Sequence, residues 1–196
     1  MSQVGFLQKI KLFLGTKQID PLPVSRAEAL YHSILQASRN PVLYGQYGVE
    51  DSIDGRFDCL CLFQSLVMRR LTGRQEQLGK LSQGLFDAMF ADMDMTLREM
   101  GVGDMGVGKR VKFMSEAYMG RLAAYDNALN QDGNQALEQA IQRNLFRDGE
   151  VEGRVAELTE EVREITKRLD EVKDDDFLEK DIDLSLFQVA SLASDS

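Results

Sequence analysis

Apolar residues recur with the three-to-four-residue period of an α-helix along most of the chain, and this limits the fold more than any other feature. The clearest case is a pair of amphipathic stretches on either side of a glycine-rich joint within 90–129. Before the joint, one helix face carries Leu78, Leu81, Leu85, Met89, Met93, Leu97 and Met100. After it, the pattern resumes with Val111, Met114, Tyr118, Leu122, Tyr125 and Leu129. Because this region never alternates with the period of a strand, we predict an all-α fold, a single bundle of about five to seven helices without a significant sheet.

The joint contains Gly101, Gly103, Gly106 and Gly108, and the cations Lys109, Arg110 and Lys112 follow at the predicted start of the next helix. Cations at a helix start oppose the partial positive charge of its unpaired N–H groups, so we expect an anionic partner nearby. The glycines match dinucleotide and P-loop patterns only formally. In those motifs a strand feeds the loop, and the P-loop hydroxyl is replaced here by Arg110. We therefore predict no nucleotide site.

Further helices are predicted on both sides of this central pair. Ser25 and Glu28 form a capping-box pattern for a helix over 25–39, which the Asn40–Pro41 pair ends. Asp54 is the predicted cap of a helix that is apolar nearly all round and should lie at the centre of the bundle. A shorter helix is expected over 134–146.

The segment after residue 148 has the most regular spacing of all. Its heptad positions are Val151, Val155, Leu158, Val162, Ile165, Leu169 and Val172. Two interpretations stay open: a homodimer seam, or a last helix packed on its own bundle. We predict four units: an amphipathic N-terminal segment over 1–20, a helical domain over 25–147, a heptad helix over 148–173 and a loosely ordered acidic tail over 174–196.

Charge is distributed unevenly. The chain has a net charge of −9, but residues 1–147 are nearly neutral and the acidic excess lies in 148–196. General nucleic-acid binding is not expected, because it needs a basic face. We hypothesise that the acidic tail covers the basic cluster after the joint when no partner is bound.

Residues for metal or covalent chemistry are few. Cys59 and Cys61 lie two positions apart on a helix and point in different directions, so they cannot form a disulfide and are expected to be small core residues. His32 is the single histidine and is expected on a surface. No metal site, cofactor or nucleophile–base pair is predicted, and the chain is not expected to be an enzyme.

The N-terminal segment is a candidate for membrane contact through Phe6, Lys9, Lys11 and Phe13, although docking on the protein's own core is an equal alternative. We find no signal peptide, transit peptide or stretch long enough to span a bilayer. The chain is therefore expected to stay where it is made.

Several strings give the chain a resemblance to a known family. They are Asp54-Gly-Arg-Phe57, Phe90-Ala-Asp-Met-Asp94, Leu97-Arg-Glu-Met-Gly-Val-Gly-Asp104, Lys109-Arg-Val-Lys112 and Gly120 through Tyr125-Asp126. With these strings the chain resembles the ubiquinol-cytochrome c chaperone family over about 31–146, whereas the segment after Asp148 follows the family's last helix only loosely.

The resemblance implies an all-helical chaperone without cofactor or catalysis. It implies binding of newly made cytochrome b during assembly of the bc1 complex, in mitochondria beside the ribosomal exit and with a small helical co-chaperone. Without a transit peptide, a bacterial, cytoplasmic member is expected, placed at the inner face of the membrane, and no co-chaperone can be inferred for it. The competing hypothesis is a coiled-coil adaptor that dimerises through 151–172.

The joint and its flanks are the predicted client surface, because flexible methionines suit adaptable binding. We expect Met95, Met105 and Met119 to be exposed, and Met89, Met93, Met100 and Met114 to belong to the core. The predicted partner-binding residues are Arg98, Gly101, Gly103, Asp104, Lys109, Arg110, Lys112, Tyr118, Arg121 and Tyr125.

Overall fold

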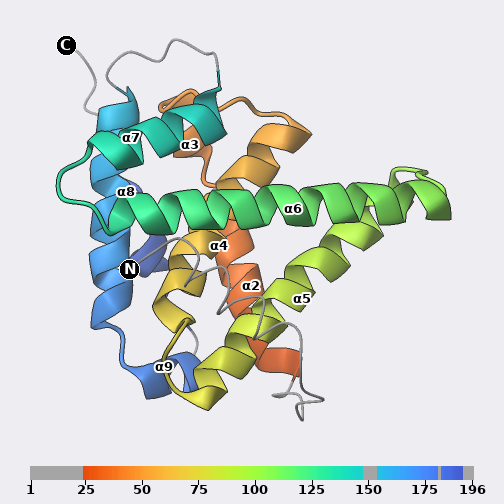
Figure 1. Ribbon diagram of the computed structural model, residues 1–196, viewed down its shortest axis with the longest axis horizontal. Coiled ribbons are helices and arrows are strands. Elements are labelled where there is room, and N and C mark those ends of the chain that lie inside the picture. Colours follow the sequence, from red (N-terminus) through yellow and green to blue (C-terminus); the bar gives the residue numbers. More distant parts are fainter. Residues whose placement is uncertain (1–23, 148–153, 181, 192–196) are drawn as a thin grey trace.

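A computed structural model describes residues 24–147, 154–180 and 182–191 of the 196-residue chain (Figure 1). The predicted N-terminal segment, with Phe6, Lys9, Lys11 and Phe13, lies outside the described residues. Within the described ranges, no helix is both long and apolar enough to cross a membrane.

The elements are all helical. They are α2 (Val24–Ser38), α3 (Pro41–Gly45), α4 (Ile53–Leu71), α5 (Glu76–Glu99), α6 (Asp104–Leu129), α7 (Gln135–Ile141) with a π-helical continuation (Gln142–Phe146), α8 (Arg154–Glu171), α9 (Asp174–Glu179) and a 3₁₀ turn (Leu184–Phe187). The described residues contain no strand. The prediction of an all-α bundle is confirmed.

Helix α4 is the centre of the bundle, as its apolar circumference predicts. It contacts α2, α5, α6 and α8, and nearly every residue from Asp58 to Leu71 is buried. Cys59 and Cys61 are buried free thiols within it, whereas His32 is exposed on α2. These three predictions are confirmed.

Three helix starts differ from those predicted. Helix α2 begins at Val24, so Ser25 lies within the helix and not at its cap. Helix α4 is capped by Ser52, whose side chain accepts a hydrogen bond from the Gly55 N–H at 3.1 Å, so Asp54 lies in the first turn. Helix α6 begins at Asp104, seven residues before the expected Val111. Lys109 and Arg110 therefore lie beyond the first turn, which instead carries the acidic Asp104, and the predicted clash with the helix dipole does not arise.

The heptad helix packs on its own bundle. Leu158, Val162, Ile165 and Leu169 of α8 are buried against the core, and α8 contacts α4 and α7. This is one of the two interpretations left open by the sequence, and it covers the face that a homodimer seam would use.

The expectation of a loosely ordered tail is wrong for the described part of 174–196. Phe177, Ile182, Phe187 and Val189 are buried in the core, and burial of their apolar side chains holds this acidic segment on the bundle. The segment begins at the start of α5, where Gln75 donates a hydrogen bond to Asp174. Since the joint lies at the other end of α5 (Figure 1), Asp174 cannot cover the basic cluster.

Candidate functional site

The joint between α5 and α6 is a well-formed turn. Gly101 has φ +81°, and the N–H groups of Gly101 and Val102 donate to the carbonyls of Arg98 and Leu97 at 2.9 and 3.1 Å. This pattern is a Schellman motif, which ends a helix with a left-handed residue and favours glycine at that position. Gly103 then caps α6. Gly101 and Gly103 thus shape the backbone.

Arg98 braces the joint. Its Nε lies 2.6 Å from Asp94 Oδ2, and its Nη1 binds Asp104 at the start of α6. One guanidinium therefore connects the last turn of α5 with the first turn of α6. Arg98 and Asp104, two of the predicted partner-binding residues, therefore form an ion pair with each other.

A groove of about 620 Å³ lies beside the joint, between the start of α4, the end of α5 and the first half of α6. Apolar side chains dominate its lining: Ile53, Phe57, Met93, Leu97, Met100, Phe113, Met114 and Ala117. Charged residues complete it, namely Asp54, Asp58, Arg110, Arg121 and Arg147, together with the polar Thr96. Such a lining suits a partner with an apolar face and few polar groups.

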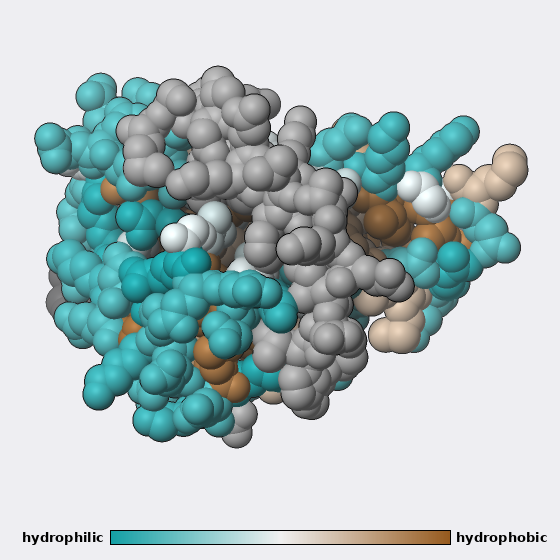
Figure 2. Space-filling model, turned by 60° about the horizontal axis from the view of Figure 1, so that its bottom comes forward, coloured by the Kyte–Doolittle hydropathy of each residue, from teal (hydrophilic) through white to brown (hydrophobic). Residues whose placement is uncertain are grey.

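Large apolar side chains are exposed around this groove. Ile53 is 63% exposed, Phe113 is 71% exposed and Met100 is also exposed in its lining, whereas the exposed Met95 and Met105 lie outside the lining. Figure 2 shows brown and tan apolar atoms among teal ones at the projecting end of the molecule. Exposed apolar side chains gathered in this way are typical of a surface that contacts another molecule.

One wall of the groove contains a buried carboxylate held by two arginines. Arg121 Nη2 lies 2.6 Å from Asp58 Oδ1, and Arg147 Nη2 lies 2.9 Å from Asp58 Oδ2. Burial raises the pKa of Asp58, whereas the charges of Arg121 and Arg147 oppose that rise. The guanidinium of Arg121 also lies over the ring of Phe57, 5.7 Å from its centroid. These contacts fix the polar wall in place.

The structure divides the predicted partner-binding residues into groups. Arg110 and Arg121 line the groove, and Arg98, Gly101, Gly103 and Asp104 build the joint next to it. Lys109 and Lys112 are exposed on α6 but do not line the groove.

The tyrosines of this prediction need correction. Tyr118 and Tyr125 are fully buried, because they continue the apolar stripe of α6 that packs on α4, and neither side chain is available to a partner. The methionine predictions are mixed. Met89 belongs to the core and Met95 and Met105 are exposed, but Met100 is half exposed and Met119 is partly buried.

Sequence reasoning missed Ile53, Phe57, Asp58, Phe113 and Arg147, which complete the groove. A signal was present for two of them: Asp58 is a carboxylate beside the most apolar stretch of its helix, and Phe113 falls outside the apolar stripe of α6. Arg147 carried none, because only the fold brings it to Asp58, 89 residues away.

The described residues contain no group of three metal-ligating side chains that could hold an ion. What they present is a helical scaffold with a partly apolar groove and cations around it. Such features are typical of a binding protein.

The chain belongs to the ubiquinol-cytochrome C chaperone family, whose model matches residues 45–185. The match continues through α8 and α9, so the part after Asp148 follows the family more closely than the sequence suggested. A crystal structure of the Cbp3 homolog from Brucella abortus is similar, with a TM-score of 0.73 and 32% identity over 85% of this chain and 92% of that one. A search of curated proteins gave no significant match.

Proposed function

We propose that the protein is a non-enzymatic chaperone for assembly of the ubiquinol-cytochrome c reductase (bc1) complex, and that it holds newly made cytochrome b. Membership of the ubiquinol-cytochrome c chaperone family supports the assembly role. The single observation that carries the client site is the groove beside the joint, with Ile53 and Phe113 exposed at its edges.

The groove suits one apolar helix of a membrane-protein client. Helix-in-groove recognition uses apolar anchors spaced along one helix face, and the lining presents Phe57, Met93 and Met114 for such anchors. The unbranched methionines adapt to several side-chain shapes. Arg110 is left without an ion pair among the described residues and offers a contact to an acidic group on the client.

This function places the protein on the cytoplasmic side of the membrane, where new client helices are made. A small co-chaperone or the ribosomal exit region would be further partners in the same proposal, and no contact of the described residues bears on either. The adaptor alternative loses its basis, because the heptad face of α8 is buried in the chain's own core.

The test is purification of the full chain from its own cells and quantification of co-purified cytochrome b by mass spectrometry. We expect Ile53→Asp/Phe113→Asp to lower recovery at least about tenfold, because two carboxylates would then have to be desolvated beneath an apolar helix. Both residues are mostly exposed, so the fold should tolerate the change.

Leu184→Asp is the matched control, since Leu184 is an exposed apolar residue that does not line this groove. Equal recovery with wild type and the groove variant would move the client site elsewhere. Absence of cytochrome b from every sample would contradict the proposed function itself.

A further inference from the structure

The first turns of α6 have a second exposed face, which does not belong to the groove. Met105, Lys109 and Lys112 are spaced i, i+4 and i+7, so they lie along one stripe of the helix. Met105 is 85% exposed, and both lysines are exposed. The groove is lined instead by Arg110, at a different angle around the same helix.

This face is basic, whereas the molecule as a whole is acidic. Residues 105–113 contain three cations and no acid, whereas the whole chain has a net charge of −9. Neither Lys109 nor Lys112 has an ion-pair partner among the described residues. The nearby carboxylate of Asp104 is already bound by Arg98. The cations are therefore free to meet an external anion.

The face also lies where a flat surface can reach it. Figure 1 shows the joint and the start of α6 at one end of the molecule's longest axis, away from α7, α8 and α9. Glu116 continues the same stripe at i+11 and would repel an anionic surface, so contact is confined to the first turns of α6.

We propose that this end of α6, through Met105, Lys109 and Lys112, docks on an anionic lipid bilayer. Each lysine near a membrane containing acidic lipids contributes Coulomb attraction, and an exposed methionine adds apolar contact at the headgroup level. The acidic remainder of the chain is repelled by the same surface, so the protein binds by this end. In that orientation the neighbouring groove lies next to the membrane.

Sedimentation of the full chain with vesicles tests this proposal. We expect binding to vesicles of phosphatidylcholine and phosphatidylglycerol at low salt, weaker binding at high salt, and no binding to pure phosphatidylcholine. Lys109→Glu/Lys112→Glu should weaken binding to the anionic vesicles by at least about tenfold, because two attractions become repulsions. Met105→Ser should produce a smaller loss.

Lys167→Glu/Lys173→Glu is the matched control, because it makes the same charge change at two exposed lysines on and after α8, and it should bind like wild type. Lys9→Glu/Lys11→Glu measures how much the N-terminal segment contributes to vesicle binding. Wild-type binding by the Lys109→Glu/Lys112→Glu variant would overturn the proposal, as would equal binding to neutral vesicles or none to anionic ones.

The groove variant Ile53→Asp/Phe113→Asp separates the two proposals. Vesicle binding should survive in that variant while cytochrome b recovery falls. If Ile53→Asp/Phe113→Asp weakened vesicle binding more than Lys109→Glu/Lys112→Glu did, the docking face would be the groove and not the stripe of α6.

Discussion

At two positions next to the groove, the backbone limits which residue fits. A Cβ on Gly55 would lie 1.9 Å from the carbonyl oxygen of Glu50, so only glycine fits in this first turn of α4. Arg147 has φ +54°, a strained conformation for a side-chain-bearing residue that costs about 1–3 kcal/mol. Its hydrogen bond to Asp58 at 2.9 Å and its longer ion pair with Asp54 at 3.8 Å offset part of that strain.

The buried thiols give a residue-scale prediction. Burial raises the pKa of Cys59 to about 12 and that of Cys61 well above its usual value. Between the unfolded pKa near 8.5 and the folded values, only the unfolded chain loses the thiol protons. The free energy of unfolding should therefore fall as the pH rises above about 9, by about 1.4 kcal/mol per pH unit for each thiol.

Chemical denaturation at a series of pH values checks this expectation, with Cys59→Ala/Cys61→Ala as the comparison. The variant should show a shallower alkaline loss, although tyrosine ionisation leaves some slope. In wild type, both thiols should resist Ellman's reagent at pH 8 until denaturant is added. Rapid labelling of the native protein would contradict the burial of Cys59 and Cys61.

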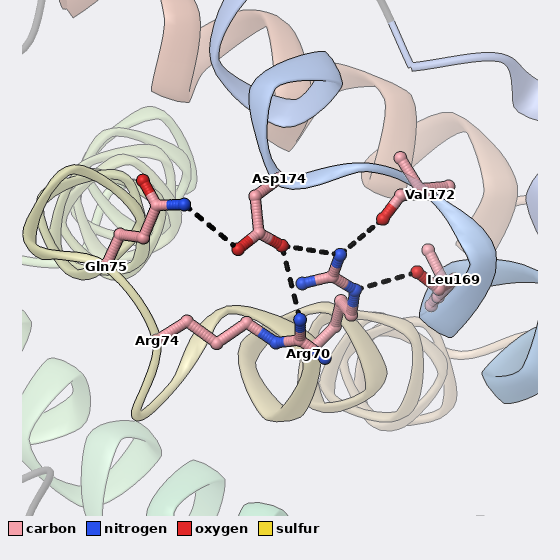
Figure 3. Close-up of polar contacts among 6 residues, drawn as sticks. All are labelled: Arg70, Arg74, Gln75, Leu169, Val172 and Asp174. Carbon is pink, nitrogen blue, oxygen red and sulfur yellow. Dashed lines mark hydrogen bonds and ion pairs between the residues drawn. The ribbon is translucent and has the colours of Figure 1, made fainter.

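At the scale of elements, arginines fasten the acidic C-terminal segment to the bundle. Arg26 donates to the Phe177 carbonyl at 2.7 Å, and Arg168 donates to Ser185 and Gln188 at 2.8 and 2.9 Å. Arg70 of α4 makes hydrogen bonds at the end of α8, as Figure 3 shows.

The contacts of Arg70 satisfy backbone carbonyls that end α8. Its Nε lies 2.9 Å from the Leu169 oxygen, and its Nη2 binds the Val172 carbonyl and lies 2.8 Å from Asp174 Oδ1 (Figure 3). The guanidinium also lies 5.0 Å from the Phe177 ring centroid. Because carbonyls at a helix end need partners, this side chain couples α4 to both α8 and α9.

Replacing Arg70 by methionine should lower the free energy of unfolding by about 3 kcal/mol, because buried carbonyls and Asp174 lose a charged donor. Hydrogen exchange should rise first over 172–180. Arg74→Met is the control: Arg74 contacts the same Asp174, but its side chain is 43% exposed against 2% for Arg70, and the change should stay within about 0.5 kcal/mol. Equal effects of the two variants would contradict this account.

For the whole molecule, the position of α8 bears on whether the heptad residues can join two chains. Its heptad residues are buried against the same core as α4 and α7, so no apolar seam is left on this helix for a second chain. Leu158, Val162, Ile165 and Leu169 are buried inside one bundle, so they cannot at the same time form the interface between two bundles.

We therefore predict that the protein has the mass of one 22.1 kDa chain in light scattering. Ile165→Ala should lower the free energy of unfolding by about 2–5 kcal/mol, because it leaves a cavity in the core, and should leave the mass unchanged. A dimeric wild type that this substitution dissociates would restore the adaptor hypothesis.

Much of the fold was predictable, since helical periodicity reports which face of each helix is apolar. The stripe from Leu78 to Met89 is buried as predicted, and α4 is central because its circumference is apolar. Tyr118 and Tyr125 show the limit of such reasoning for the site. Their stripe already indicated burial, yet large aromatic residues near a joint also suit a binding surface, and the sequence alone did not separate the two roles.

By itself, then, the sequence determined the helices, their apolar faces and the glycine turn at Gly101, because these depend on neighbours a few residues apart. Tertiary structure alone decided that α8 turns its heptad face inward and that the acidic segment packs beside Arg70. It also decided that Arg147 reaches Asp58 to close the groove wall. The contacts of Arg70 and Arg147 join residues 89 to 104 positions apart, and the free energy of each depends on burial that only the assembled bundle provides.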